Sequence, residues 1–233
     1  MFVLIVANGV PSPSKVGSGI FEFEQAKALR LMGCKVVFAV LDLTSIRHRR
    51  KMGIESYKKD NVDVIRLNVP CGAIGTRNLN MVGNLAFKKL YKRILEQFGT
   101  PDVIHAHFSL HPGIAVMEAI RKKSIPFIVT EHSSAIHTKR ITSYEKRCLK
   151  HIISIASNFI CVGEGLKRSI IELTNTKKNI EVIPNIVSPI FSYQEKIKNV
   201  NEFIFLGVGN LNEGKRFDLS IDAFTKAFKG NTK

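Results

Sequence analysis

Short runs of apolar residues alternate with amphipathic segments along most of this chain. The apolar runs are nearly uninterrupted, which is typical of strands covered on both faces of a parallel sheet. The clearest amphipathic segment spans about residues 84 to 98, where apolar side chains recur at helical spacing and lysines occupy the other side. This rhythm predicts an α/β fold with a doubly wound parallel sheet. The predicted strands are Phe2–Ala7, Lys35–Val40, Val62–Leu67, Asp102–His107, Pro126–Thr130, Phe159–Val162, Ile180–Ile183 and Phe203–Val208.

The alternation breaks once, at a polar and basic stretch between residues 188 and 201, which is interpreted as a linker. One predicted strand and one predicted helix, from about Phe217 to Phe228, follow it. One strand and one helix cannot bury a hydrophobic core of their own. We therefore expect a domain of residues 1–187, a linker of residues 188–201, and an incomplete second domain that begins with residues 202–233.

Basic residues give the chain a net charge of +16, and they are concentrated in two stretches. Residues 47–93 hold twelve Lys and Arg against three acidic residues, and residues 139–150 hold a second group with Glu145 as their only acid. Such stretches attract anions, whether nucleic acid, phosphorylated substrates or anionic lipid. They lack interleaved aromatic residues, so no nucleic-acid partner is predicted. Peripheral contact with an anionic membrane fits better.

Neither a signal peptide nor a membrane span is predicted. The apolar start, Phe2–Ala7, has no preceding basic residue, and every apolar run is far shorter than the roughly 20 residues that a span needs. The four cysteines show no C-x-x-C spacing, which favours a reducing compartment. A cytoplasmic protein is expected, with contact at the cytoplasmic face of the membrane left open.

A glycine-containing loop, Gly17-Ser18-Gly19, precedes a helix that is expected to start near Ile20. Glycine lets a phosphate or sugar approach backbone N–H groups, and a helix N-terminus favours negative charge. The spacing does not match a dinucleotide site, because about nine residues separate the strand from the loop and Glu22 occupies the third glycine position. The loop is therefore either a diphosphate site or an ordinary flexible connection.

His105 and His107 lie at the end of one predicted strand, and His111 follows. Side chains two residues apart on a strand point to the same face, so this pair could bind a metal ion. No carboxylate or further histidine stands at ligand spacing, and no metal site is predicted. The histidines are expected to line a pocket at the mouth of the strand or to be satisfied within the core.

The next predicted strand ends in Thr130-Glu131-His132, at the edge of the sheet where substrate contacts are expected. His132 could donate a hydrogen bond to a sugar hydroxyl or stabilise developing charge, or it could be satisfied within the turn. Glu131 could be a carboxylate catalyst, or it could accept hydrogen bonds from nearby backbone N–H groups.

A second glycine turn, from Gly209 to Lys215, separates the last predicted strand from the last helix. Backbone N–H groups, a helix dipole and a lysine charge would converge there on a diphosphate. From the spacing alone, a solvated lysine in a tight turn is the simpler explanation.

Five segments in this order resemble the GT-B glycosyltransferases of family 4 (group 1), which build polysaccharides and glycolipids. The resemblance implies two Rossmann-like domains that face each other across a cleft, the first mainly holding the acceptor and the second the sugar nucleotide. The similar segments are Gly17 to Val36, Asp102–His107 (family pattern D-V-I-H-x-H), Thr130–Ser133 (T-x-H), Val182–Asn185 (V-I-P-N-G-V) and Val208 to Phe224.

The resemblance also implies retaining transfer from a nucleotide-sugar donor to a polysaccharide or lipid-linked acceptor, with no metal and no cofactor. It makes His132 the catalytic residue in contact with the donor sugar. Near the donor phosphates it places Gly17, Ser18, Gly19 and Lys215. On the acceptor side of the pocket we expect His105, His107 and Glu131.

Three features depart from the family pattern. Asn210 stands where the family usually has a phosphate-binding Arg, for which Arg216 could partly substitute, and Ile186 replaces a Gly. The family's paired-glutamate element (E-x7-E), which holds the donor sugar and ribose, would lie beyond residue 233. The resemblance therefore implies a truncated chain whose own activity is impaired or absent.

The sequence leaves two other functions to consider. A sugar-nucleotide epimerase with a similar twin-domain fold would need an extra acid/base signature, and none is found. A non-catalytic Rossmann-like module that binds an acceptor or an anionic membrane would need no donor domain, and this alternative stays open.

Overall fold

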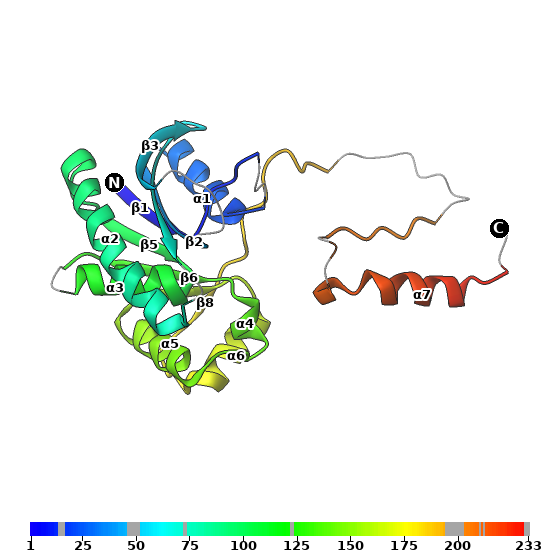
Figure 1. The fold of residues 1–233 in the computed structure, drawn as a ribbon. Helices are drawn as coiled ribbons and strands as arrows, with labels where there is room; N and C mark the ends of the chain where they lie inside the picture. The colour runs from blue at the N-terminus through cyan, green and yellow to red at the C-terminus, as the bar shows by residue number, and fades with distance from the viewer. Residues whose placement is uncertain are drawn as a thin grey trace. The chain divides into compact units, whose positions relative to one another are not determined.

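The computed structural model describes residues 1–13, 17–45, 52–71, 74–121, 124–193, 203–209, 211 and 213–230. Two units make up the chain, Met1–Phe191 and Ser192–Lys233. The first unit contains an eight-stranded sheet in the order β3-β4-β2-β1-β5-β6-β7-β8 (Figure 1). The strands are β1 (Phe2–Ala7), β2 (Lys35–Ser45), β3 (Gly53–Lys59), β4 (Val62–Cys71), β5 (Val103–His107), β6 (Phe127–Glu131), β7 (Asn158–Cys161) and β8 (Glu181–Val182).

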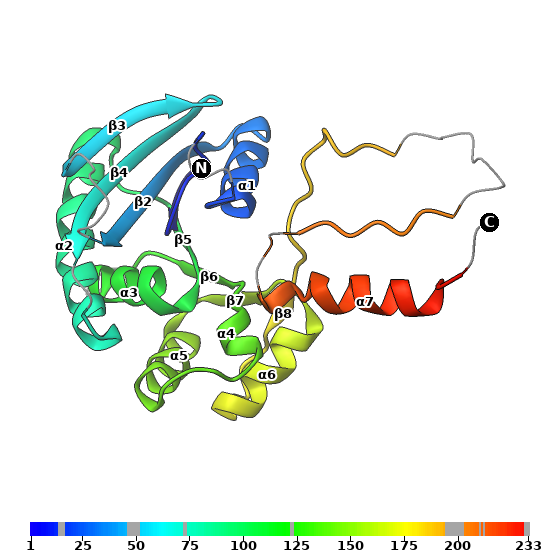
Figure 2. The ribbon, with the colours of Figure 1, turned by 45° about the vertical axis from the view of Figure 1, so that its right-hand side comes forward.

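Neighbouring strands are parallel throughout except for β3, which runs antiparallel to β4 at one edge of the sheet (Figure 2). The predicted α/β fold with a doubly wound sheet is thereby confirmed. The sequence pattern did not reveal β3, because an edge strand with half of its side chains exposed shows no continuous apolar run.

Helices cover both faces of this sheet. On one face Phe23 and Ala26 of α1 pack against β1, β2 and β4, and on the other face α2, α3 and α5 contribute to a larger apolar cluster. The helices of the first unit are α1 (Ile20–Leu31), α2 (Thr76–Phe98), α3 (Ile114–Ile120), α4 (Ser134–His137), α5 (Ser143–Ile155) and α6 (Glu164–Thr174), with a π-helical turn, η1 (Ser109–Gly113), before α3.

Helix α2 contains the segment predicted as helical, and it begins well before residue 84. Its buried stripe of Phe87, Leu90, Tyr91 and Ile94 follows the expected spacing. The first turns were missed because their buried positions are Asn80 and Gly83 while Met81 points to solvent, so apolar residues do not mark the buried face there.

The start of α1 lies directly against the loop that follows β1. Gly19 caps the helix with φ 71°, in the left-handed region that glycine adopts without strain. A Cβ added at Gly19 would lie 2.2 Å from the carbonyl oxygen of Gly9. The two backbone segments are therefore in direct contact, and this contact fixes where the glycine loop ends.

We expect Gly19→Ala to lower the free energy of unfolding by about 2–4 kcal/mol, through left-handed strain and a clash with backbone that cannot rotate away. Gly17→Ala is the matched control, because a Cβ at Gly17 meets no atom within 4 Å; it should change stability by less than about 0.5 kcal/mol. Urea unfolding of both variants measures the difference, and equal effects would show that Gly19 is not held as described.

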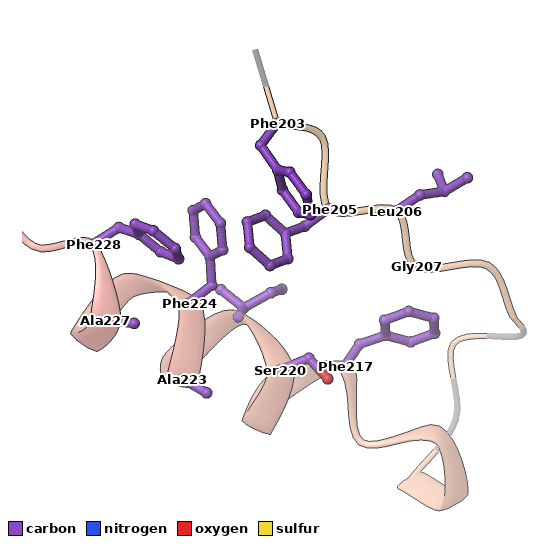
Figure 3. Close-up of a pocket in the computed structure, with 11 residues that line it drawn as sticks. Phe203, Phe205, Leu206, Gly207, Phe217, Ser220, Ala223, Phe224, Ala227 and Phe228 are labelled. Atoms are coloured by element: carbon purple, nitrogen blue, oxygen red, sulfur yellow. The ribbon is translucent and has the colours of Figure 1, made fainter. Parts of the chain in front are cut away.

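The described residues of the second unit include the segment 203–209, the turn η2 (Glu213–Lys215) and the helix α7 (Phe217–Ala227). Phe205 packs edge-on against Phe224 and lies beside Phe228, as Figure 3 shows. None of the side chains described in this unit is buried. The prediction of a strand at Phe203–Val208 is wrong. A strand needs a hydrogen-bonded neighbour, and none of the described residues of this unit provides one.

Candidate functional site

Three histidines meet at the carboxyl ends of the neighbouring strands β5 and β6. The rings of His105 and His107 stack with centroids 4.5 Å apart, as expected for side chains two residues apart on one strand. The His105 Nε2 atom lies 2.7 Å from Thr130 Oγ1, and the His107 Nδ1 atom lies 2.9 Å from His132 Nε2. Register places His107 opposite Thr130, which brings the ends of both strands together.

Helix α1 brings the glycine loop to the same place. The ring of Phe21, in the first turn of α1, lies parallel to His132 with centroids 6.4 Å apart. The ring of Phe108 also lies near His132, with the centroids of the two rings 5.2 Å apart. The first turn of α1, which directly follows the loop Gly17–Gly19, therefore lies near the turn at His132.

Phe108 reaches His132 from a backbone with φ 70°, a conformation that non-glycine residues rarely adopt. Such strain persists where the surrounding structure holds it, and it is common at functional sites. Phe108 and the neighbouring Ser109 carried no signal in the sequence beyond their position directly after the His105–His107 strand.

Burial keeps all three histidines neutral near pH 7. It lowers the pKa of His105 to about 4, and the neighbouring His132 contributes. It lowers the pKa of His132 to about 4 as well, where the Asn185 side chain partly opposes the shift. The pKa of His107 is lowered well below its usual value by burial and by the other two rings. A neutral imidazole donates one hydrogen bond and accepts one, so the site offers polar contacts rather than positive charge.

These shifts predict a loss of stability in acid. A histidine whose pKa is lower in the folded state contributes stability above its unfolded pKa, and this contribution is lost as the pH falls from about 6.5 toward 4. For His105 the full effect is on the order of 3 kcal/mol. We expect the slope of unfolding free energy against pH to be shallower in His105→Asn than in the wild type between pH 6.5 and 4.5. Identical slopes in urea titrations would contradict the buried neutral state of His105.

Glu131 is fully buried directly beneath this cluster. Its carboxylate accepts hydrogen bonds from the Ser109 N–H (2.8 Å) and hydroxyl, the His132 N–H (2.9 Å) and the Ser133 N–H (2.8 Å). Burial raises the pKa of Glu131, and these four hydrogen bonds oppose that rise. The structure shows one of the two interactions that the sequence left open: Glu131 accepts backbone hydrogen bonds and ties the chain after β5 to the chain after β6.

His111 lies apart from the other three histidines, in the turn η1. Its φ is 61°, and burial lowers its pKa while the Glu145 charge opposes the shift. No group of three or more His, Cys, Asp or Glu side chains in the described part of the chain is arranged to hold a metal ion.

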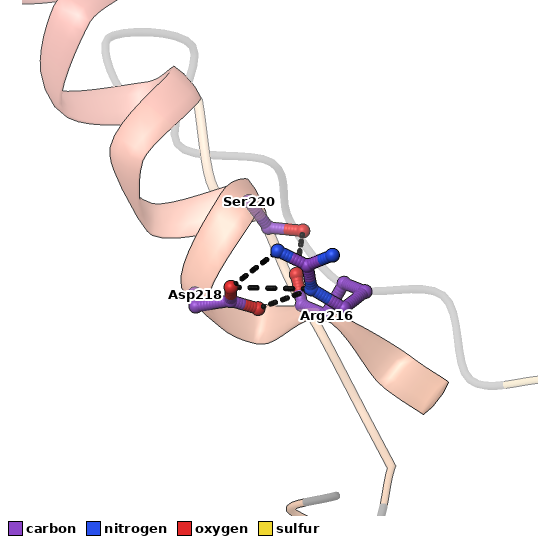
Figure 4. A network of polar contacts seen from close by, with 3 residues as sticks. All are labelled: Arg216, Asp218 and Ser220. Carbon is purple, nitrogen blue, oxygen red and sulfur yellow. Dashed lines mark hydrogen bonds and ion pairs between the residues drawn. The ribbon is translucent and has the colours of Figure 1, made fainter. Parts of the chain in front are cut away.

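Two of the site residues expected in the second unit, Arg216 and Lys215, differ in whether an acidic side chain among the described residues pairs with them. Arg216 forms a two-pronged ion pair with Asp218, with its Nη2 2.7 Å from a carboxylate oxygen (Figure 4). Lys215 is exposed at the end of η2, and no ion pair is recorded for it among the described residues. Lys215 is thus the more available cation for a phosphate. Asn210 lies outside the described residues.

Asn185 lies beside His132, near the end of the first unit. Its position in the Pro-Asn element was visible in the sequence, whereas its proximity to His132 was not. The residue links the histidine cluster to the segment that leads toward the second unit.

Comparison with known families matches residues 17–190 to the model of Glycosyltransferase Family 4. TuaC of Bacillus subtilis, named for teichuronic acid biosynthesis, is 25% identical over 200 residues, which cover 77% of this chain and 49% of TuaC. MJ1178 of Methanocaldococcus jannaschii, described as an uncharacterized glycosyltransferase, is 30% identical over 135 residues, or 58% of this chain and 36% of MJ1178. The chain therefore spans about half the length of the first relative and about a third of the second.

Solved structures agree on the fold. Sucrose-phosphate synthase from Thermosynechococcus elongatus superimposes with a TM-score of 0.59 at 18% identity, over 78% of this chain and 47% of that one. A trehalose-6-phosphate protein from E. coli, bound with UDP-2-fluoro glucose, gives a TM-score of 0.56 at 12% identity, over 82% of this chain and 50% of that one. At sequence identities this low, the structural similarity establishes the fold and nothing further.

Proposed function

Because the chain belongs to Glycosyltransferase Family 4, we propose that it forms the acceptor-side part of a retaining glycosyltransferase that takes a sugar from a nucleotide-sugar donor. The proposal includes transfer without a metal ion or cofactor and a cytoplasmic location. Its main support is the His105–His107–His132 cluster at the carboxyl ends of β5 and β6, with Phe21 at the start of α1 near His132.

Residue roles follow from this arrangement. The N–H groups at the start of α1 and its helix dipole favour the negative charge of a diphosphate. His132, neutral and partly buried, is suited to donate a hydrogen bond to an oxygen of the donor sugar. His105 and His107 lie behind it and support the acceptor side of the pocket.

The donor nucleotide would be held mainly by the second unit, where Lys215 offers an exposed positive charge. The E. coli structure with UDP-2-fluoro glucose supports a nucleotide sugar as donor class. We propose that the polypeptide of residues 1–233 shows little or no transfer by itself. The reason is that none of the described side chains of its second unit is buried, so the described residues of this unit form no core that would hold a nucleotide rigidly.

A glycan or lipid-linked acceptor is the proposed acceptor class. TuaC, whose name refers to teichuronic acid biosynthesis, supports a polymer of the cell envelope. The test is to join residues 1–187 to the C-terminal half of TuaC and to assay sugar transfer with a panel of nucleotide sugars. We expect transfer by the fusion and not by residues 1–233 alone. A soluble, folded fusion that hydrolyses or transfers no sugar from any donor would count against the function.

We also propose contact with an anionic membrane through one face of α2, here called the basic face (Met81, Leu85, Lys88, Lys89 and Lys92). Met81 is 60% exposed and Leu85 65% exposed, and the three lysines lie on the same side of the helix one to three turns further on. Exposed apolar side chains beside cations are typical of surfaces that bind anionic lipid. No helix in the described part of the chain is long and apolar enough to span a bilayer.

Replacing Lys88, Lys89 and Lys92 together by Gln should weaken binding to phosphatidylglycerol vesicles roughly 100-fold at low salt, at about 1 kcal/mol for each lysine. A matched control replaces the exposed cations Lys146, Arg147 and Lys150 of α5 by Gln. Vesicle sedimentation measures both. Equal losses in the two variants, or wild-type binding no stronger to anionic than to phosphatidylcholine vesicles, would rule out the basic face.

A further inference from the structure

Strand β3 lies at one edge of the sheet, and β4 is its one hydrogen-bonded neighbour among the described residues (Figure 2). Every second residue of an edge strand turns its backbone N–H and C=O groups away from the sheet, where another strand can pair with them. A proline, a bulge, a short length or charged side chains usually protect such an edge. β3 has seven residues, contains no proline and pairs with β4 from Gly53 to Lys59 without a bulge. Its charged side chains therefore decide what can pair with it.

A tight turn and a contact with α1 hold the end of β3 in place. Asp60 and Asn61, which connect β3 to β4, have φ of 46° and 61°, as in the two-residue turns that favour hairpins. The Lys59 Nζ atom lies 5.8 Å from the centre of the Phe23 ring in α1. The strand thus has a fixed register on β4 and a fixed face toward α1.

Alternation along β3 puts Glu55, Tyr57 and Lys59 on the face of the sheet that α1 covers. Tyr57 is 39% exposed, and neither Glu55 nor Lys59 has an ion pair recorded among the described residues. An acid, an aromatic ring and a base thus follow one another on one face at two-residue spacing. This order is complementary to its own reverse, because the acid then meets the base.

Symmetry restricts how two copies of β3 can pair. Side chains opposite each other must lie on the same face, so two antiparallel copies related by a two-fold axis place one residue opposite itself. With Tyr57 at the centre, Glu55 of each copy lies opposite Lys59 of the other. Centring on Glu55, Lys58 or Lys59 puts like charges opposite each other, and centring on Ser56 leaves Glu55 opposite Tyr57. Of the positions 55 to 59, Tyr57 is the centre that pairs opposite charges.

We propose that β3 is a dimer interface, which pairs antiparallel with β3 of a second copy of this chain about a two-fold axis at Tyr57. The two sheets join into one, and a Glu55–Lys59 pair lies on each side of the Tyr57 pair. Cross-strand pairs of opposite charge and of aromatic rings both stabilise antiparallel strands. β4, β2 and β1 separate β3 from β5, so the pairing does not involve the histidine cluster of either copy.

Sedimentation equilibrium of residues 1–233, from low to high micromolar concentrations, tests the interface. We expect a dimer. Glu55→Lys turns two attractive pairs into two repulsive ones and should weaken the dimer roughly 10- to 100-fold. Lys59→Glu added to Glu55→Lys exchanges the two charges and should bring the dissociation constant back to within about threefold of the wild type. Glu96→Lys makes the same change of charge at an exposed position of α2 and should alter the constant by less than about threefold.

Disulfide cross-linking tests the alignment. Tyr57→Cys places two Cβ atoms opposite each other at about 4.5–5.5 Å, so mild oxidation should join the two copies more than it does in the wild type. Ser56→Cys is the control, because Ser56 lies opposite Lys58 and its two copies are too far apart for a disulfide. Cross-linking of Ser56→Cys equal to that of Tyr57→Cys, or none in Tyr57→Cys, would overturn the alignment.

A wild-type monomer at every concentration would overturn the proposal. A dimer that Glu55→Lys weakens no more than Glu96→Lys would do the same, since association would then use another surface. The mass of the wild-type protein decides whether a dimer exists even if a variant does not fold. Sugar transfer plays no part in these measurements, so they stand or fall separately from the proposed function.

Discussion

Replacing Glu131 by Ala is expected to lower the free energy of unfolding by about 3–5 kcal/mol, the largest stability effect of any single substitution in the site. The carboxylate is fully buried and accepts four hydrogen bonds, three of them from backbone N–H groups that cannot rotate away. Without it these donors stay buried and unpaired. Urea unfolding at pH 7 measures the loss.

Two further variants make this result specific. Glu131→Gln keeps one carbonyl oxygen as an acceptor, but its NH₂ group would face N–H donors on one side. The variant should therefore lower the free energy of unfolding by only about 1–3 kcal/mol. Glu96→Ala removes an exposed carboxylate from α2 and should change stability by less than about 0.5 kcal/mol. If Glu131→Ala were no more destabilising than Glu96→Ala, the carboxylate would not hold the ends of β5 and β6 together.

Replacing His132 by Ala in the active fusion is expected to lower kcat about 10²- to 10³-fold, the usual effect of removing one donor that stabilises developing charge. The KM for the donor should change less, because the proposed diphosphate contacts do not involve His132. Initial rates with the preferred nucleotide sugar provide both constants.

The control for this prediction is His151→Ala, on the exposed side of α5. It should leave the rate within about twofold of the wild type. If His132→Ala retained full kcat in a fusion that transfers sugar, His132 would not be the residue in contact with the reacting sugar.

Much of the fold could be predicted because parallel strands buried on both faces give continuous apolar runs. The runs at β1, β2, β4, β5, β6 and β7 were found in this way. The ends of β5 and β6 could also be paired in advance, since the carboxyl ends of parallel strands meet at one edge of the sheet. From the sequence, His107 and His132 were each expected at the end of a predicted strand, and the hydrogen bond between them was not predicted.

The remaining features depend on tertiary contacts that leave no periodic signal. The role of Glu131 depends in part on hydrogen bonds from Ser109, which directly follows Phe108 and its positive φ. The contact between Phe21 and His132 joins residues far apart in the chain through the packing of α1. Asn210 and the division into residues 1–187, 188–201 and 202–233 stay predictions.

The most direct test of the proposed site is to map nucleotide-sugar binding by amide chemical shifts on the fusion of residues 1–187 with the C-terminal half of TuaC, with UDP-, GDP- and ADP-sugars at millimolar concentrations. The proposal predicts shifts that rise with concentration at Gly17, Gly19, Phe21, His132 and Asn185 for at least one donor. It also predicts that these shifts are absent with the free sugar alone. Shifts confined to other parts of the first unit, or none with any donor, would contradict a donor site at the histidine cluster.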